Sequence, residues 1–241
     1  MPLADRCTPL LEWNVTNPLP LYGVKGNRRP SKLSFGMEAP PWLETGDRER
    51  PFHFSQAMHR LCADIALRCP LFHSFDLNRI LFGFSQARKG QTHGLQARVT
   101  PMRFANGESV RWIRGKSYRV QQYQYEGREI LYLVTFCLPR FLDRSFEDKL
   151  ITIFHELYHI DPRFNGDLRR HQGRYAFHTA SQKEYDRGMA ELAREYLSIG
   201  AAPQLYDFLR LTFEQLHSRH GLIVANRFPR PKLIPVGEKP S

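Results

Sequence analysis

The chain has 241 residues, of which 41% are hydrophobic, and its 35 Lys and Arg against 24 Asp and Glu give a formal net charge of +11. This composition supplies enough apolar surface for a folded core and excludes a fully disordered chain. No apolar run approaches the roughly 18 residues that a membrane span requires, so we expect a soluble protein with no membrane partner.

The cysteines and the first residues of the chain bear on its compartment. Four cysteines lie far apart, at Cys7, Cys62, Cys69 and Cys137, and none forms a Cys-x-x-Cys pair. The N-terminal residues lack the basic and then apolar pattern of a secretory signal. We therefore expect reduced cysteines and a cytoplasmic location.

Both ends of the chain are rich in proline and show no periodic pattern. Eight prolines fall in residues 1–52 and four in residues 222–241. Because proline disrupts a helix interior or a central strand, we predict an extended N-terminal arm and a basic C-terminal tail. Residues 53–221 between them form the single predicted domain.

The first half of that domain begins with a helix and continues with strands. Apolar residues recur at helical spacing over 55–67, and Pro70 ends the segment. Strand-like runs follow at 79–86, 94–104, 110–113, 118–125 and 129–138. The last two flank Glu126-Gly127-Arg128, which predicts a hairpin turn with glycine at a positive φ. These runs predict a mostly antiparallel sheet.

Positive charge is concentrated between Arg88 and Arg119, where eight basic residues stand against Glu108 alone, a net charge of +7. A basic patch attracts phosphates, so this segment is a candidate contact for nucleic acid. The alternative is the solvated outer face of a sheet, where alternating strands place charges outward.

Three helices are predicted in the second half of the domain, at 145–160, 181–197 and 203–221. The first begins at the N-cap Ser145 and the second at a capping box over 181–184. One backing helix, a mostly antiparallel sheet, the helix at 145–160 and two closing helices together predict an α+β domain.

The first of these three helices carries His155-Glu156-Leu157-Tyr158-His159, an HExxH motif. Residues four apart lie on one helix face, so both imidazoles can reach one ion while Glu156 lies beside it. Neutral imidazole suits Zn²⁺, and a nearby carboxylate can take a proton from water that the metal acidifies. His155 and His159 are therefore candidate zinc ligands, and Glu156 is the candidate general base.

The motif leaves the third ligand open. The metzincin pattern requires Gly and His where this chain has Pro162 and Asn165, which excludes that class. Five candidates follow the motif: His171, His178, Glu184, Glu191 and Glu195. His178 is also a candidate donor to the oxyanion formed in amide hydrolysis. Asp161 or Asp167 could orient a ligand imidazole, although an Asp before Pro is also an ordinary turn residue.

Residues 155–175, HELYHIDPRFNGDLRRHQGRY, resemble the predicted zinc metallopeptidases of archaea, bacteria and phages, in which an HELLHI-like helix precedes an LRPHG-like segment. Leu168-Arg169-Arg170-His171 matches the second element, so the resemblance implies that His171 is the third ligand. The SprT-like proteases, which act on DNA-bound proteins, are a more distant likeness through HExxH, a later His and a basic surface.

These features together predict an α+β zincin-like domain with Zn²⁺ as cofactor, acting as a metallopeptidase on a peptide or protein substrate. In zincins, an edge strand above the active-site helix pairs with the extended peptide. The alternative is a basic nucleic-acid-binding protein whose zinc site is structural or vestigial.

Overall fold

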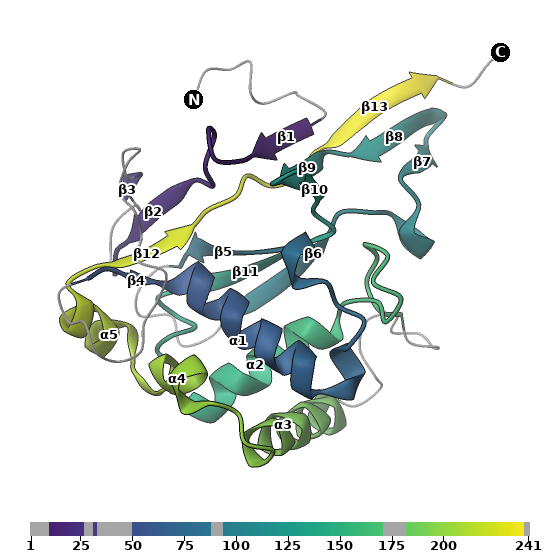
Figure 1. The fold of residues 1–241 in the computed structure, drawn as a ribbon. Coiled ribbons are helices and arrows are strands. Elements are labelled where there is room, and N and C mark those ends of the chain that lie inside the picture. The colour runs from purple at the N-terminus through teal and green to yellow at the C-terminus, as the bar shows by residue number, and fades with distance from the viewer. Residues whose placement is uncertain (1–9, 27–30, 33–49, 88–93, 171–181, 239–241) are drawn as a thin grey trace.

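The computed structural model describes residues 10–26, 31–32, 50–87, 94–170 and 182–238. Within these ranges the fold is mixed α+β, as predicted, with helices gathered at one end of the molecule and most strands at the other (Figure 1). None of the helices in these ranges has the length and apolar character needed to cross a membrane.

Three predicted helices are confirmed, with bounds shifted by one or two residues: α1 (Phe54–Arg68), α2 (Phe146–Tyr158) and α3 (Gln182–Ser198). The last predicted helix is instead broken into α4 (Pro203–Tyr206), a 3₁₀ turn (Asp207–Arg210) and α5 (Phe213–His220). The break has a local cause. Thr212 and Gln215 form a capping box in which each side chain accepts a hydrogen bond from the other residue's N–H, so α5 starts afresh.

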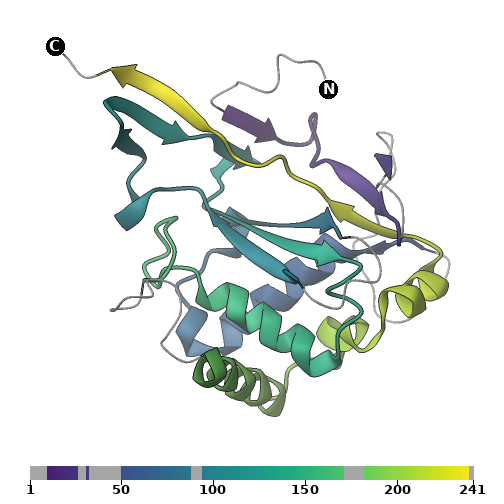
Figure 2. The same cartoon turned by 180° about the vertical axis from the view of Figure 1, so that it is seen from behind.

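The central sheet supports the candidate site. Its strands, in spatial order, are β5 (Ile80–Gln86), β11 (Tyr132–Leu138) and β6 (Ala97–Pro101). β11 runs parallel to β5 and antiparallel to β6. α1 packs against β5 and α2 against β6, and the main hydrophobic core lies between the sheet and these helices (Figure 2). β6 is therefore an edge strand that lies beside α2.

Three further sheets complete the described fold, and most of their pairings are antiparallel. They are β1 (Leu10–Trp13) with β9 (Gln122–Tyr125) and β10 (Arg128–Glu129); β3 (Ser31–Lys32) with β2 (Leu21–Val24), β12 (Ile223–Asn226) and β4 (Phe52–His53); and β13 (Leu233–Glu238) with β8 (Lys116–Val120) and β7 (Val110–Ile113). The predicted turn at Glu126-Gly127 joins β9 to β10, with φ of 51° and 72° at these residues.

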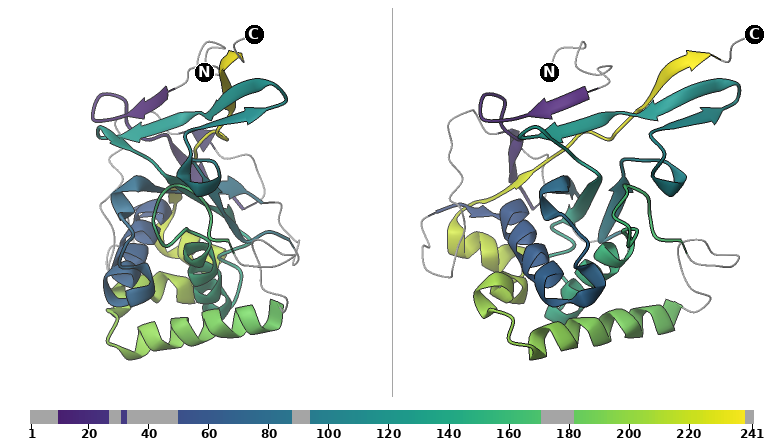
Figure 3. Two further views of the ribbon diagram at one scale, coloured as in Figure 1. Left: turned by 90° about the vertical axis from the view of Figure 1, so that its right-hand side faces the viewer. Right: turned by 45° about the vertical axis from the view of Figure 1, so that its right-hand side comes forward.

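The ends of the described chain differ from the predicted arm and tail. β2 pairs with β12, and Val24 and Ile223 are both buried, so segments from both sides of the predicted domain share one sheet (Figure 3). The predicted boundaries at residues 53 and 221 therefore do not separate structural units. Strands of four residues are too short to produce a detectable period, and Pro235 is tolerated within β13 because this strand lies at a sheet edge.

Candidate metal centre

The end of α2 presents the HExxH motif. The helix starts because the Ser145 hydroxyl accepts a 3.1 Å hydrogen bond from the Asp148 N–H, and acidic residues in the first turn favour its positive end. Its apolar face is buried at Leu150, Ile153, Phe154 and Leu157. The motif lies in the last turn, with His159 as the C-cap residue.

The two imidazoles of the motif converge. His155 Nε2 and His159 Nε2 are 2.9 Å apart, and their rings meet at 83°. Two nitrogens that bind one tetrahedral Zn²⁺ at about 2.1 Å lie about 3.4 Å from each other, so a small movement lets both nitrogens bind one ion. The pair therefore fits a zinc ion as two of its ligands.

Glu156 lies on the buried side of the same turn, and only 6% of its surface is exposed. Burial raises the pKa of its carboxyl to about 7, and a hydrogen bond with the backbone of Val99 partly opposes that shift. Val99 belongs to β6, so the carboxyl group lies between α2 and the edge strand of the central sheet.

The chain turns back to α2 immediately after the motif. Ile160 and Leu168 form an antiparallel bridge, and the N–H of Arg169 donates to the carbonyl of His159 at 2.7 Å. The Arg169 side chain also donates to the carbonyl of Tyr158 at 2.8 Å, and its guanidinium lies 4.0 Å from the centre of the Tyr158 ring. Arg169 is thus fastened to the C-terminal end of α2 at three points.

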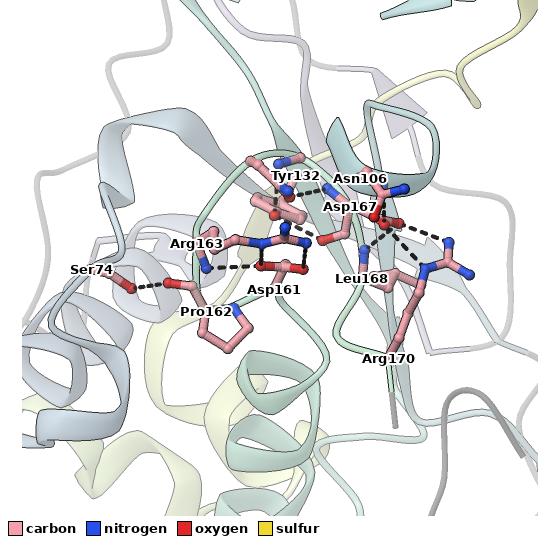
Figure 4. A network of polar contacts seen from close by, with 11 residues as sticks. Ser74, Asn106, Tyr132, Asp161, Pro162, Arg163, Asp167, Leu168 and Arg170 are labelled. Carbon is pink, nitrogen blue, oxygen red and sulfur yellow. Dashed lines mark hydrogen bonds and ion pairs between the residues drawn. The ribbon is translucent and has the colours of Figure 1, made fainter. Parts of the chain in front are cut away.

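A network of polar contacts holds this loop against the central sheet (Figure 4). Tyr132 of β11 contacts the loop backbone through its hydroxyl, and the Asp167 carboxylate accepts from the N–H groups of Asn106 and Leu168. Gly166 has a φ of +88°, and a side chain there would collide with Arg103. The loop is therefore held in place by residues that are distant from it in sequence.

Asp161 and Asp167, which could orient a ligand imidazole, have other partners in this structure. The Asp161 carboxylate accepts from the backbone and side chain of Arg163, and the side-chain bond is the main reason that its pKa lies below the usual value. Besides the two N–H groups, Asp167 pairs with Arg170. Both carboxylates thus stabilise the loop itself.

Of the five candidate third ligands, Glu191 and Glu195 have side chains within the described part of the chain, and both are exposed. His171 and His178 are outside the described residues, as is the side chain of Glu184. Glu191 is described, and its largely exposed carboxylate lies 4.0 Å from Arg187. Among the described side chains, no group of three His, Cys, Asp or Glu is assembled for a metal. The pair His155 and His159 is therefore the part of the predicted site that the structure brings together.

Sequence reasoning missed Tyr132, Asn106 and the docking role of Arg169. Tyr132 carries only the signal of a buried strand residue, and Asn106 only that of a turn before glycine. Both residues bond to Asp167, which lies 35 residues from Tyr132 and 61 residues from Asn106, and no local sequence pattern predicts contacts over such separations.

A separate pocket of about 1210 Å³ lies between β2, β5 and the start of α1. His53 and His59 line it, and burial lowers the pKa of both imidazoles, that of His53 to about 4. His155, Glu156 and His159 do not line this pocket. The size of a pocket therefore does not identify the candidate site. The assignment of that site rests on the chemistry of the HExxH residues.

No known family model, curated protein or solved structure matches the chain. The case for a function therefore rests on the geometry of these residues.

Proposed function

We propose that the chain is a zinc-dependent metallopeptidase with a zincin-like domain, in which His155 and His159 bind the metal. The single observation that carries the proposal is the 2.9 Å separation of the two Nε2 atoms, on the helix that also buries Glu156. At this distance one neutral imidazole can donate a hydrogen bond to the other, and the same convergence of two ring nitrogens is what a shared zinc ion requires.

Each residue of the motif has a distinct role in this proposal. Zinc, when bound, supplies a Lewis acid that polarises the scissile carbonyl and acidifies water. Glu156 would act as the general base, accepting a proton from the attacking water and returning it to the leaving amine, since its carboxyl group is one residue from a proposed ligand and lies beside the edge strand.

In this proposal the substrate peptide binds along the edge strand β6. A strand at the edge of a sheet can pair with an extended peptide through main-chain hydrogen bonds. The backbone of Val99 on this strand is within hydrogen-bonding reach of the Glu156 carboxyl group. A peptide paired with β6 would therefore lie next to the proposed base.

His171 is the proposed third ligand. Arg169 is held to the carbonyls of Tyr158 and His159, and His171 is two residues further along the chain. Two residues span at most about 7 Å, so the backbone returns to the motif shortly before this histidine. His178 remains the alternative ligand or oxyanion donor, and Glu184 or Glu191 would make the site one with an acidic third ligand.

Glu156→Gln tests the proposed chemistry. The variant is expected to keep its zinc and to cleave a peptide mixture at least about 10²-fold more slowly, because an amide cannot take the proton. The matched control is Glu147→Gln, the same change at an exposed position of the first turn of α2, which should leave cleavage unchanged. Retained zinc with no cleavage by the wild type would favour the alternative of a nucleic-acid-binding protein with a structural zinc site.

A further inference from the structure

The sheet formed by β7, β8 and β13, here called the outer sheet, stands away from the helices (Figures 1 and 3). Its strands have their main contacts with one another. Its strands and the turn between β7 and β8 hold four basic residues and one acidic residue, a net charge of +3: Arg111, Arg114, Lys116, Arg119 and Glu238. Lys232 adds a further positive charge just before β13, where its carbonyl accepts a hydrogen bond from the N–H of Gln121, just after β8.

This surface differs from the basic segment that the sequence indicated between Arg88 and Arg119. Arg103 pairs with Glu129, and Arg98 lies on β6 of the central sheet. Arg111 and Arg114 are exposed, and neither has a carboxylate partner among the described residues. Folding therefore divides the segment and brings Lys232 from the C-terminal side beside part of it.

Aromatic side chains lie among these charges. Trp112 is 53% exposed, although burying an indole is normally favourable. Its neighbours across the sheet are Ser117 and then Gly237, which are too small to cover its ring. On the other face, Arg111 lies directly opposite the half-buried Tyr118. Trp112 and Arg111 thus lie on opposite faces of β7, and because β7 is an edge strand of the outer sheet, a chain that runs along this edge can reach both side chains.

We propose that the β7 edge of the outer sheet binds single-stranded nucleic acid, with Arg111 and Arg114 contacting phosphates and Trp112 stacking on a base. Phosphates supply the negative charge that this surface complements, and every base has a face on which an indole can stack. In a duplex the bases are already stacked, so the exposed ring would find no partner. The proposal is independent of zinc and of peptide cleavage.

The test uses the full chain and a labelled oligothymidylate of about 20 nucleotides, longer than a typical single-strand site. Fluorescence anisotropy should show binding that is tighter than to a duplex of equal length. The affinity should fall between about 50 and 200 mM salt, with a log–log slope of about −0.7 for each phosphate contacted. Absence of binding at the lowest salt, or tighter binding to the duplex, would overturn the proposal.

Two kinds of variant separate charge from stacking. Replacing Arg111 and Arg114 together by Gln should weaken binding and flatten the salt slope by about 1.4, the loss of two phosphate contacts. Trp112→Ala should weaken binding about fivefold or more with little change in slope, whereas Trp112→Phe should keep most of the affinity. Circular dichroism of each variant checks that the fold is retained.

The matched control removes the same charge elsewhere. Arg187 and Arg194 are exposed on α3, at the end of the molecule opposite the outer sheet (Figure 1). Replacing both by Gln should change the slope little. An equal loss in this control would show that net charge alone drives binding. Equal competition by polyglutamate would point to any acidic polymer, and either result contradicts a nucleic-acid site on the outer sheet.

Discussion

The Tyr132 hydroxyl donates a 2.9 Å hydrogen bond to the Asp167 carbonyl, and it accepts one of 2.8 Å from the N–H of Gly166. It thereby joins β11 to the loop that follows α2. We expect Tyr132→Phe to lower the free energy of unfolding by about 1 to 3 kcal/mol, because it leaves the buried N–H of Gly166 without its partner and the Asp167 carbonyl with only the N–H of Asp161. Urea denaturation measures this. Tyr118→Phe, at a half-buried tyrosine, should cost less than about 0.5 kcal/mol, and equal costs would contradict a bracing role for Tyr132.

Purified protein should carry close to one zinc per chain, and His155→Ala or His159→Ala should remove it, because one imidazole from the pair cannot hold the ion. Plasma emission spectrometry gives the zinc content. The control is His217→Ala, which removes an exposed histidine from α5. Stoichiometric zinc in a variant lacking both His155 and His159 would refute the assignment.

The third ligand is tested by competition with a chelator. His171→Ala should lower zinc affinity by orders of magnitude, whereas His178→Ala should keep the metal and at most slow turnover. Zinc lost from His178→Ala alone would reverse the two roles. If both variants keep zinc and Glu184→Ala or Glu191→Ala releases it, the third ligand is an acid.

Lys149 should make stability depend on pH. Its side chain is 1% exposed and donates to the carbonyls of Leu209 and Leu211. Burial lowers the pKa of its ammonium group from 10.5 to about 8, a difference that corresponds to about 3 kcal/mol. The folded state thus releases this proton more readily than the unfolded chain, so this group's contribution to stability increases as pH rises from about 8 to 10.5.

Comparison with Lys149→Met isolates this effect, because other groups titrate in the same range. Buried tyrosines such as Tyr123, whose pKa burial raises, oppose it at alkaline pH in both proteins. Unfolding by urea at several pH values should show the wild type gaining up to about 3 kcal/mol relative to the variant. Parallel pH profiles for the two proteins would show that Lys149 titrates normally.

The sequence predicted those features that depend on neighbours along the chain. α1, α2 and α3 follow from apolar spacing and capping residues, and the approach of His155 to His159 follows from four-residue spacing on a helix. The prediction of one continuous helix at 203–221 was wrong. The apolar pattern continues through Thr212, but the hydroxyl of this residue caps α5, so a new helix starts there.

Features that depend on distant segments were not predictable. β12 appeared to be part of a tail, although its four residues are buried between β2 and β4. Asp167 appeared free to orient a ligand imidazole, but its carboxylate meets the N–H of Asn106, which is 61 residues away. The edge strand beside Glu156 could not be chosen until the order β5, β11, β6 was known.

The pairing of β2 with β12 has a consequence for how the chain folds. Leu21 lies opposite Asn226, a separation of 205 residues, so this pairing closes almost the longest loop that the chain allows. Contacts of such separation cost chain entropy before they contribute stability, which slows folding. We expect the helices to gain protection from hydrogen exchange first and the amides of Ile223–Asn226 last, in refolding followed by pulse labelling. Early protection of this strand would show instead that the two ends of the domain meet before its middle is ordered.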